Sequence, residues 1–582
     1  MFERRLLFFD FEVTPSLWMV TFVEYETKKV LTIINDREKL KKFYDLAKEC
    51  IFISYNGRTY DIPIFKSILL GLNPYRVSTQ LIEQGKKAYQ ILPKEHKQIK
   101  FYHYDTSTGF HSLKQLEGFL GMNIEESSVS FSKDNLTDDD IVSLKKYNIH
   151  DVLATIEVFE KRLDEFKAYM TLMKMFDLPL EYLNKTKAQL GAIILDAKKP
   201  TIDRGDDWDL RVPTNLQLGR YEFVKDWFFS DESKEPNAKL KLVAYGVEGI
   251  IAWGGAHFAK KNITRTGFMV NYDISSMYPQ TMIVHDTLSR NIKDKNKFVE
   301  IRDLRLEYKR THKDELSYAL KILINSIFGA SGDKYNDLYD ERNKRLTCMY
   351  GQLFILDLLD KLETHFGNSI ECIQINTDAV MFKLENNQQY LEFKEIISEW
   401  EKRSKYTMEG DEISYYCAKD VNNYVMKITN TGELVKVKAK GAMVKKNTPL
   451  DNDLSIVNTA IRDYLCEGIP VEKTINECDD YIKFQKIYKI TSNYKYAIHN
   501  GSPLPNKVNR VFASKNKLDT SIFKLKKGKE KPDLFAGSPD HCFVDNSDIR
   551  EKSIPDNLDK QWYIAIAIKR VEMFTKEKYK ID

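Results

Sequence analysis

RLLFFDFE, residues 5–12, is the stretch from which the fold of the amino-terminal third can be worked out. Its apolar run predicts a strand, and Asp10 and Glu12, two residues apart on it, then face the same side of a sheet. Two further strands are expected at residues 18–24 and 29–34, joined by the polar turn ETKK. A pair of carboxylates therefore lies on the first of three antiparallel strands.

The segments that follow alternate between helical and extended patterns. They comprise a helix at about 37–49, a strand at 50–55, a helix at about 61–71, a strand at 100–105, and helices at about 111–120 and 138–165. Three antiparallel strands followed by alternating helices and strands is the element order of the ribonuclease H-like fold, which this part of the chain resembles.

Two short motifs add carboxylates to the first pair. NGRTYD, residues 56–61, places Asp61 at the start of a helix, and YNIHD, residues 147–151, places Tyr147 and Asp151 on one helical face. Four carboxylates brought together would have to bind cations or protonate in part. Oxygen ligands favour Mg²⁺ or Mn²⁺ over zinc, and two such ions can clamp the attacking and leaving oxygens of a displacement at phosphorus. The four carboxylates therefore predict a two-ion site.

A second set of motifs follows much later in the chain. A strand at 268–273 ends in DISSMYP, residues 273–279, and residues 370–384 read as two strands around a tight turn that carries Asp378. KILINSIFG, residues 321–329, places Lys321 and Asn325 on one face of a helix. Arg305 and Lys309 are also four residues apart, so two basic helices can direct their charge at a triphosphate.

The order and spacing of these motifs resemble a family B DNA polymerase with a 3′→5′ exonuclease, of the compact phage type. The resemblance implies a multidomain α/β protein in which a ribonuclease H-like exonuclease domain is joined to a right-hand polymerase of palm, fingers and thumb. The expected domains are the exonuclease at 1–185, a linker and the start of the palm at 186–265, the first part of the palm at 266–300, the fingers at 301–350, the second part of the palm at 351–450 and the thumb at 451–582.

The resemblance also implies roles for exonuclease residues. Asp10, Glu12, Asp61 and Asp151 would hold two metal ions, and Tyr147 would orient the attacking water. The single-stranded primer end would bind at Asn56, Ser112 and Leu113.

In the polymerase part, Asp273, the carbonyl of Ile274 and Asp378 would hold two Mg²⁺ or Mn²⁺ ions. Tyr278 would pack under the deoxyribose and exclude a ribose 2′-hydroxyl. The triphosphate would bind to Ser275, Ser276, Met277, Arg305, Lys309, Lys321 and Asn325, and primer-template DNA to Gly254, Gly255, Tyr424, Lys438 and Lys440.

The polymerase motifs depart from the family pattern at several positions, among them Met277 for leucine and Phe328 for tyrosine, and three other departures bear on polymerase activity. Asn376 stands where an aspartate is usual, Ala379 replaces a serine, and Asn422 stands where the KxY motif has its lysine. An exonuclease with a weakened polymerase site therefore stays open, as does a non-catalytic scaffold that binds nucleic acid. A protein-primed polymerase is a further alternative, although the short separation of Asp273 and Lys321 leaves no room for the two inserts of that class.

Net charge, cysteine pattern and the length of apolar runs restrict which classes of protein remain possible. The net charge of +4 does not by itself indicate a nucleic-acid binder, and the seven cysteines include no CxxC pair, which argues against a disulfide framework or a structural zinc site. Asp10 and Glu12 interrupt the first apolar run too early for a signal peptide, and no run of 18 apolar residues occurs. We expect a monomer in the cytoplasm, that of the host cell if the protein is viral. Its partners would be DNA, dNTPs and replisome proteins such as a processivity factor, and it would have no membrane contact.

Overall fold

The computed structural model describes residues 4–201, 204 and 207–580, and the remaining residues of the predicted domains lie outside it. The chain divides into two compact units. The first contains residues 1–184, 447–456 and 476–563, and the second contains residues 185–446, 457–475 and 564–582. The segment expected to be a thumb, residues 451–582, is thus shared between the two units.

The first unit is built on a five-stranded sheet of order β3-β2-β1-β4-β5. Strands β1 (Leu6–Val13), β2 (Trp18–Glu24) and β3 (Val30–Ile34) are antiparallel, which confirms the three strands expected from the sequence. Strands β4 (Ile51–Ser54) and β5 (Tyr102–Asp105) extend the sheet in parallel with β1.

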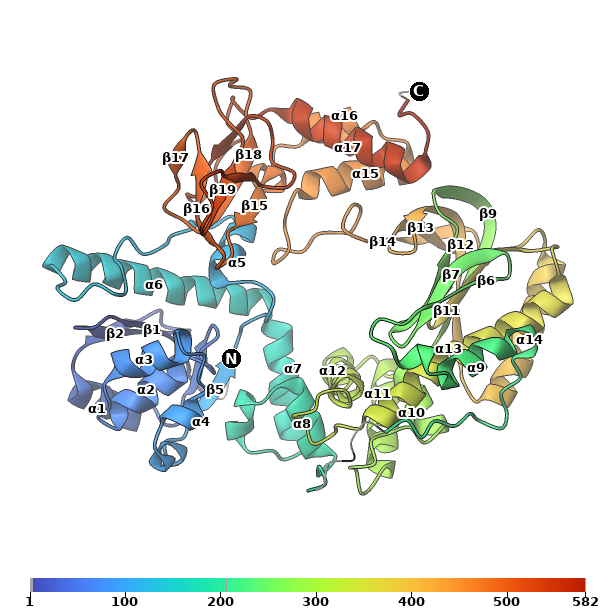
Figure 1. Cartoon of the computed structure of the whole chain (residues 1–582), viewed down its shortest axis with the longest axis horizontal. Coiled ribbons are helices and arrows are strands. Elements are labelled where there is room, and N and C mark those ends of the chain that lie inside the picture. Colours follow the sequence, from blue (N-terminus) through green and yellow to red (C-terminus); the bar gives the residue numbers. More distant parts are fainter. Residues whose placement is uncertain (1–3, 202–203, 205–206, 581–582) are drawn as a thin grey trace. The chain divides into compact units, whose positions relative to one another are not determined.

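Helices cover both faces of this sheet (Figure 1). The helices of this part of the chain are α1 (Arg37–Leu46), α2 (Asp61–Leu69), α3 (Pro74–Ile82), α4 (Ala88–Ile91), α5 (Leu113–Phe119), α6 (Asp138–Lys161) and α7 (Leu163–Met175), of which α2, α3 and α6 contact β1. The helix expected at 138–165 is in fact two, because Arg162 leaves the helical conformation at φ −121°. Its side chain instead donates to the carbonyl of Thr106 and to Glu165.

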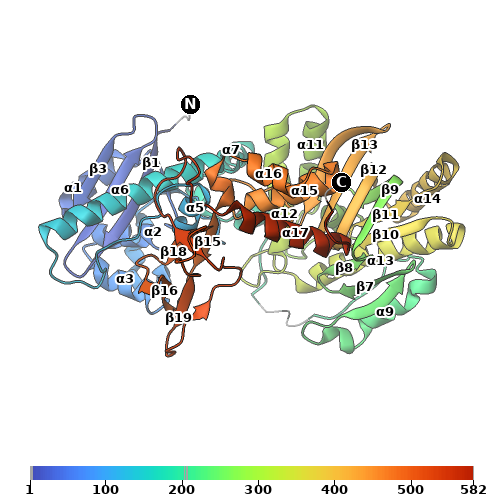
Figure 2. The same ribbon diagram turned by 90° about the horizontal axis from the view of Figure 1, so that it is seen from above.

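The alternation of β1 decides where its carboxylates point. Phe9 and Phe11 pack into the aromatic core beneath α1 and α2, where they contact Phe65. Phe8 points the other way and meets Phe159 of α6 edge to face at 5.1 Å. Because side chains alternate along a strand, Asp10 and Glu12 share the α6 side with Phe8. Figure 2 shows α6 crossing over this sheet.

Strands from late in the chain complete the first unit. One sheet holds β15 (Lys486–Lys489), β18 (Val508–Ala513) and β21 (Cys542–Val544); the other holds β16 (Tyr494–His499), β17 (Ser502–Pro503), β19 (Phe523–Lys526) and β20 (Asp533–Leu534). Arg510 of β18 is fully buried and donates to the carbonyls of Ser547, Gly118 and Met122. These bonds attach the late strands to the end of α5, which is why residues 476–563 belong to this unit.

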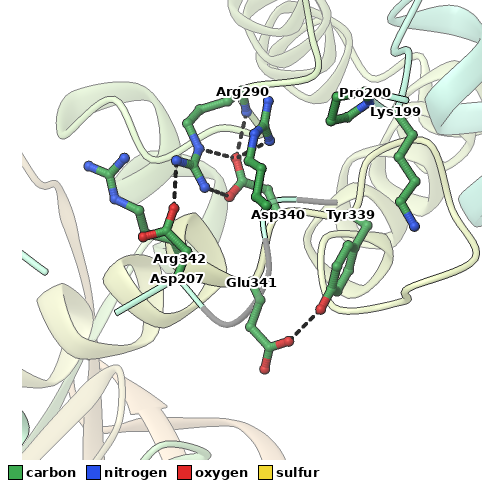
Figure 3. Close-up of a pocket in the computed structure, with 9 residues that line it drawn as sticks. Lys199, Pro200, Asp207, Arg290, Tyr339, Asp340, Glu341 and Arg342 are labelled. Carbon is green, nitrogen blue, oxygen red and sulfur yellow. Dashed lines mark hydrogen bonds and ion pairs between the residues drawn. The ribbon is translucent and has the colours of Figure 1, made fainter. Parts of the chain in front are cut away.

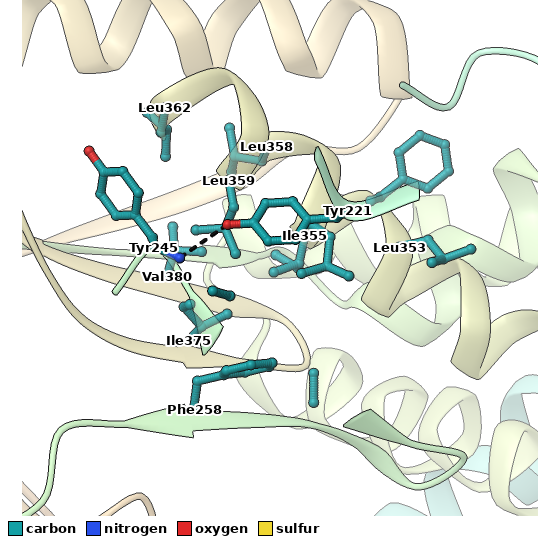
Figure 4. Close-up of a cluster of buried hydrophobic side chains, with 14 of the residues drawn as sticks. Tyr221, Tyr245, Phe258, Leu353, Ile355, Leu358, Leu359, Leu362, Ile375 and Val380 are labelled. Carbon is teal, nitrogen blue, oxygen red and sulfur yellow. Dashed lines mark hydrogen bonds between the residues drawn. The ribbon is translucent and has the colours of Figure 1, made fainter. Parts of the chain in front are cut away.

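The second unit contains a nine-stranded antiparallel sheet of order β14-β13-β12-β9-β11-β10-β8-β7-β6. Its strands are β6 (Leu240–Ala244), β7 (Val247–Ala252), β8 (Gly255–Ala259), β9 (Ile263–Ile274), β10 (Glu371–Asn376), β11 (Ala379–Lys383), β12 (Met408–Asp420), β13 (Asn423–Asn430) and β14 (Glu433–Lys440). Helices α13 (Glu341–Phe366) and α14 (Asn387–Ser404) lie beside it. Figure 4 shows the shared core, in which Leu358 and Leu362 of α13 approach Ile375 and Val380 of the sheet.

The remaining helices of the chain are mostly short. They are α8 (Lys187–Ile194), α9 (Glu222–Phe229), α10 (Met277–Val284), α11 (Asn296–Arg310), α12 (Asp314–Ala330), α15 (Ser455–Glu467), α16 (Val471–Glu477) and α17 (Lys560–Thr575). Helices α11 and α12 pack against each other. Among the described residues, no helix combines the length and the apolar character needed to cross a bilayer.

The start of α13 is fixed by a buried ion-pair network (Figure 3). Asp340 caps the helix, and the guanidinium of Arg290 donates to both of its carboxylate oxygens at 2.9 and 2.7 Å. Arg290 also donates to Asp207 at 2.8 Å. The side chain of Asp340 is fully buried, so its charge depends on this partner.

Replacing Arg290 with alanine should lower the free energy of unfolding by about 3 kcal/mol, because it leaves the Asp340 carboxylate buried without its bidentate partner. Denaturant unfolding followed by circular dichroism measures the change. Arg310→Ala is the matched control, since Arg310 is exposed at the end of α11, and it should have little effect. Equal stabilities for the two variants would contradict this role for the ion pair.

Candidate active sites

Four carboxylates of the first unit meet in one pocket. Oxygens of Asp10, Glu12 and Asp151 lie within 4.8 Å of one another. Asp61, the first residue of α2, accepts a hydrogen bond of 3.0 Å from the amide of Phe11, between the two β1 carboxylates. All four line a pocket that also includes Tyr147. The structure thus brings together the acidic residues predicted from three separate motifs.

Without bound cations, the buried carboxylates of this pocket repel one another when they are ionised. Burial, followed by the charges of neighbouring carboxylates, raises the pKa of Asp10 and of Glu12 well above the ordinary range. Burial likewise raises the pKa of Asp61 to about 7 and that of Asp151 to about 6. An all-oxygen donor set of this kind suits a hard divalent cation, whose charge would keep the carboxylates ionised.

Lys114, which the sequence analysis missed, supplies an internal cation. Its ammonium group forms ion pairs with Asp151 and, at 3.0 Å, with Glu117, whose side chain is fully buried. Burial opposes the charge of Lys114, but the two carboxylates outweigh it and raise the pKa of the amine. The ammonium also lies 4.6 Å from the centre of the Tyr147 ring. The only sequence signal was its spacing of three residues from Glu117 on a helix.

Of the residues predicted to bind the single-stranded primer end, one lines the carboxylate pocket and two do not. Asn56 is exposed, lines the carboxylate pocket, and adopts a left-handed backbone with φ 62°. Asp105 fixes that loop by accepting from the amides of Asn56 and Arg58 at 2.9 and 3.0 Å. Ser112 instead caps α5, and Leu113 packs against the apolar cluster below it; neither lines the pocket.

Two carboxylates also meet in the second unit. Asp273 lies near the end of β9 opposite Ala379, and the amide of Ile274 donates to the carbonyl of Asp378 at 2.7 Å. Burial, and next the charge of Asp378, raises the pKa of Asp273 to about 7. The tight turn between β10 and β11 therefore places Asp378 beside Asp273 as predicted.

Contacts between the β10–β11 turn and β8 explain why position 255 is a glycine. Asn376 ends β10 and pairs with His257 of β8. Thr377 accepts from the amide of Ala256 at 3.1 Å, and a Cβ on Gly255 would lie 2.3 Å from the Thr377 hydroxyl. Gly255 also has φ 141°, so this position requires glycine, whereas Gly254 is exposed with open space around it.

Basic residues of α11 reach the DISSMYP turn. Arg305 donates to the hydroxyl of Ser276 at 3.1 Å, and Ser276 has a left-handed φ of 51°. Lys309 pairs at 3.5 Å with Glu409, which also accepts from Ser275 at 2.9 Å. Positive charge is thus placed beside the turn predicted to hold phosphate.

The helix α12 contributes an aromatic contact to this site. The ring of Tyr278 stacks on Phe328 with centroids 3.8 Å apart and an interplanar angle of 8°. Met277 is buried close to Gly351 of α13. Lys321 and Asn325 are exposed on α12, and within the described residues neither side chain bonds to Asp273 or Asp378.

The predicted DNA-binding residues of β13 and β14 lie in one part of the sheet. Tyr424 is buried opposite Lys440, which is exposed. Burial and then the charges of Asp273 and Asp378 raise the pKa of Tyr424, so its ring approaches both carboxylates. The charge of Lys438 in turn opposes the upward shift of the pKa of Asp273.

A family model of the RNase H superfamily matches residues 7–163. These residues form a ribonuclease H-like domain. No curated protein matches the chain. Among solved structures, the chain is similar to the family B DNA polymerase from the hyperthermophilic archaeon Pyrobaculum calidifontis, at 13% identity and a TM-score of 0.42, over 100% of this chain and 79% of that one. The ribonuclease H-like domain contains all four clustered carboxylates.

Stability in the absence of divalent ions should fall as the pH rises from about 4 to about 7. In this window the folded protein holds protons on the cluster that the unfolded chain has released, because the folded pKa values are raised and the unfolded ones lie near 4. Mg²⁺ should raise the melting temperature most at the upper end of the window, where the carboxylates bind it ionised. Thermal melts in EDTA and in Mg²⁺ measure both effects.

Asp10→Asn should raise the melting temperature in EDTA at neutral pH and reduce the gain from Mg²⁺, because it removes one buried like charge. Asp134→Asn, at an exposed position of the same domain, is the control and should change neither value. A lower melting temperature for Asp10→Asn in EDTA would show that the cluster is not under charge repulsion.

Proposed function

We propose that the chain is a DNA-dependent DNA polymerase of family B that extends a primer and proofreads it with a 3′→5′ exonuclease. The observation that carries the exonuclease half is the four-carboxylate pocket of the ribonuclease H-like domain. The polymerase half is supported by the paired carboxylates Asp273 and Asp378 and by the cations of α11 beside them. A phage origin is part of the proposal and is supported by the compact motif arrangement.

In the polymerase site, Asp273 and Asp378 would hold Mg²⁺ or Mn²⁺, which would favour ionisation of the primer 3′-hydroxyl and offset the charge of the leaving pyrophosphate. Arg305 and Lys309 would bind the triphosphate, since they already reach the adjoining turn. Lys321 and Asn325 present an exposed polar face that an incoming nucleotide can approach.

In the exonuclease site, the same class of ion would activate water and stabilise the leaving 3′-oxygen. Lys114 keeps Asp151 ionised, so this carboxylate remains a ligand at neutral pH. The phenol of Tyr147 lies at the pocket beside Asp151, and its raised pKa, caused first by burial and then by that carboxylate, keeps it a hydrogen-bond donor able to orient water.

An exonuclease with a weakened polymerase site is the second candidate. It is favoured by Asn376, which ends β10 two residues before Asp378, where the resemblance calls for an aspartate. This leaves Asp273 and Asp378 as the motif carboxylates of the polymerase site. Primer extension decides between the two candidates.

Asp273→Ala should abolish primer extension, with a loss of at least about 10³-fold, because it removes a preorganised charge from the metal site. Degradation of single-stranded DNA should survive. Asp10→Ala with Glu12→Ala should do the reverse. Gel assays in Mg²⁺, with and without dNTPs, measure both activities.

If the wild-type protein degrades primers but never extends them, the second candidate holds. Near-normal extension by Asp273→Ala would overturn the assignment of the polymerase site, and primer digestion by the double variant would overturn that of the exonuclease.

Tyr278→Ala should increase the incorporation of ribonucleotides relative to deoxyribonucleotides. The Phe328 ring backs Tyr278 at 3.8 Å, so the phenol forms a rigid wall that can exclude a 2′-hydroxyl by shape. Single-nucleotide insertion with dNTP and rNTP measures the ratio. Tyr335→Ala is the control, because Tyr335 is 86% exposed, and it should leave the ratio unchanged. An unchanged ratio in Tyr278→Ala would assign this ring to packing alone.

A further inference from the structure

A second pocket opens in the ribonuclease H-like domain, on the other side of the loop at residues 55–61. Its floor is apolar and includes Ile62 and Pro63 of α2, together with Leu92 and Phe101. Its volume is about 380 Å³, within the range of pockets that hold small organic ligands. None of the four clustered carboxylates lines it.

The rim of this pocket is strongly basic. Arg58, Lys66, Lys97 and Lys100 line it, and within the described part of the chain none of them forms an ion pair. Glu181 is the one acidic residue among those that line it. The four cations outnumber the single carboxylate, so the pocket carries a net positive charge.

One group of this rim lacks the partner that burial normally demands, and a second is a partly buried cation. The Nε of Arg58 is buried and makes no hydrogen bond to the protein. Lys66 donates to the carbonyl of His96 at 3.1 Å, and burial followed by the charge of Lys100 lowers the pKa of its amine to about 8. Cations in such surroundings are stabilised when an anion binds between them.

We propose that this pocket binds a nucleoside monophosphate. The phosphate would bind among Arg58, Lys66 and Lys100, and the base would lie on the apolar floor at Phe101 and Leu92. An apolar floor beside a concentrated positive rim fits a compact ligand with one anionic end. A polynucleotide strand would instead require charge spread along an open groove.

The proposed ligand is also the product that an exonuclease releases, and this part of the inference rests on the proposed function. Removal of a primer end releases a nucleoside monophosphate. The loop that carries Arg58 into this pocket carries Asn56 and Asp61 into the carboxylate pocket. Asp105 accepts from the amides of both Asn56 and Arg58, so one carboxylate holds the loop residues that line the two pockets.

Binding is tested with dAMP and dTMP by isothermal titration calorimetry, using the Asp10→Ala, Glu12→Ala protein in EDTA. This protein cannot bind product through metal at the carboxylate pocket, so the result does not depend on exonuclease activity. Lys66→Gln and Lys100→Gln should each weaken binding about tenfold, the loss expected for one charge-assisted hydrogen bond. Lys100 is exposed, so its replacement does not endanger folding.

Lys41→Gln, at an exposed position of α1, is the matched control and should bind as the parent does. Absence of binding, equal competition by inorganic phosphate, or tighter binding of a single-stranded oligonucleotide would each overturn the proposal. Binding that is lost in Lys66→Gln and kept in Lys41→Gln would support it, even if the wild-type protein proved to have no exonuclease activity.

Discussion

Charge repulsion among buried carboxylates is the constraint on which the amino-terminal unit depends. Alternation along β1 directs Asp10 and Glu12 to the face covered by α6, and the amide of Phe11 holds Asp61 between them. The side chain of Asn148 donates to Asp10 at 2.8 Å, and Lys114 neutralises Asp151. These contacts compensate only part of the negative charge, so the remaining carboxylates must take up protons or bind further cations. A protein that keeps such a pocket is suited to chemistry at phosphate.

The second unit also brings carboxylates together, but only two of them, and the cations around them are arranged differently. Asp273 and Asp378 are half-buried at the centre of a wide sheet, and their neighbours include the exposed Lys438 and the half-buried Arg305 rather than an enclosed lysine. Lys438 approaches from the sheet, and Arg305 from a helix outside it. Positive charge that is exposed remains available to an anionic ligand, whereas a cation enclosed like Lys114 is committed to the protein. The proposed binding of a triphosphate would require such accessible positive charge.

The parts of the fold that the sequence predicted are those specified by local patterns. Short apolar runs bounded by polar turns located β1 to β3, and four-residue spacing placed Tyr147 with Asp151 and Arg305 with Lys309. Lys114 was missed because its role depends on Asp151, 37 residues away, and a single lysine carries no periodic signal. Arg510 was missed for the same reason, since its partners at Gly118 and Met122 are distant in sequence. The division of residues 451–582 between two units likewise depends on tertiary contacts that no local pattern encodes.

The loop at residues 55–61 shows how closely packing fixes the geometry of the carboxylate pocket. A Cβ on Gly57 would lie 1.8 Å from the hydroxyl of Ser54, and Asn56 is held at a positive φ that few residues adopt. One carboxylate, that of Asp105, accepts from two amides of the loop. The backbone therefore has little freedom to adjust on one side without moving on the other. Residues of this loop line a negative pocket and a positive one, so the same backbone positions side chains in both.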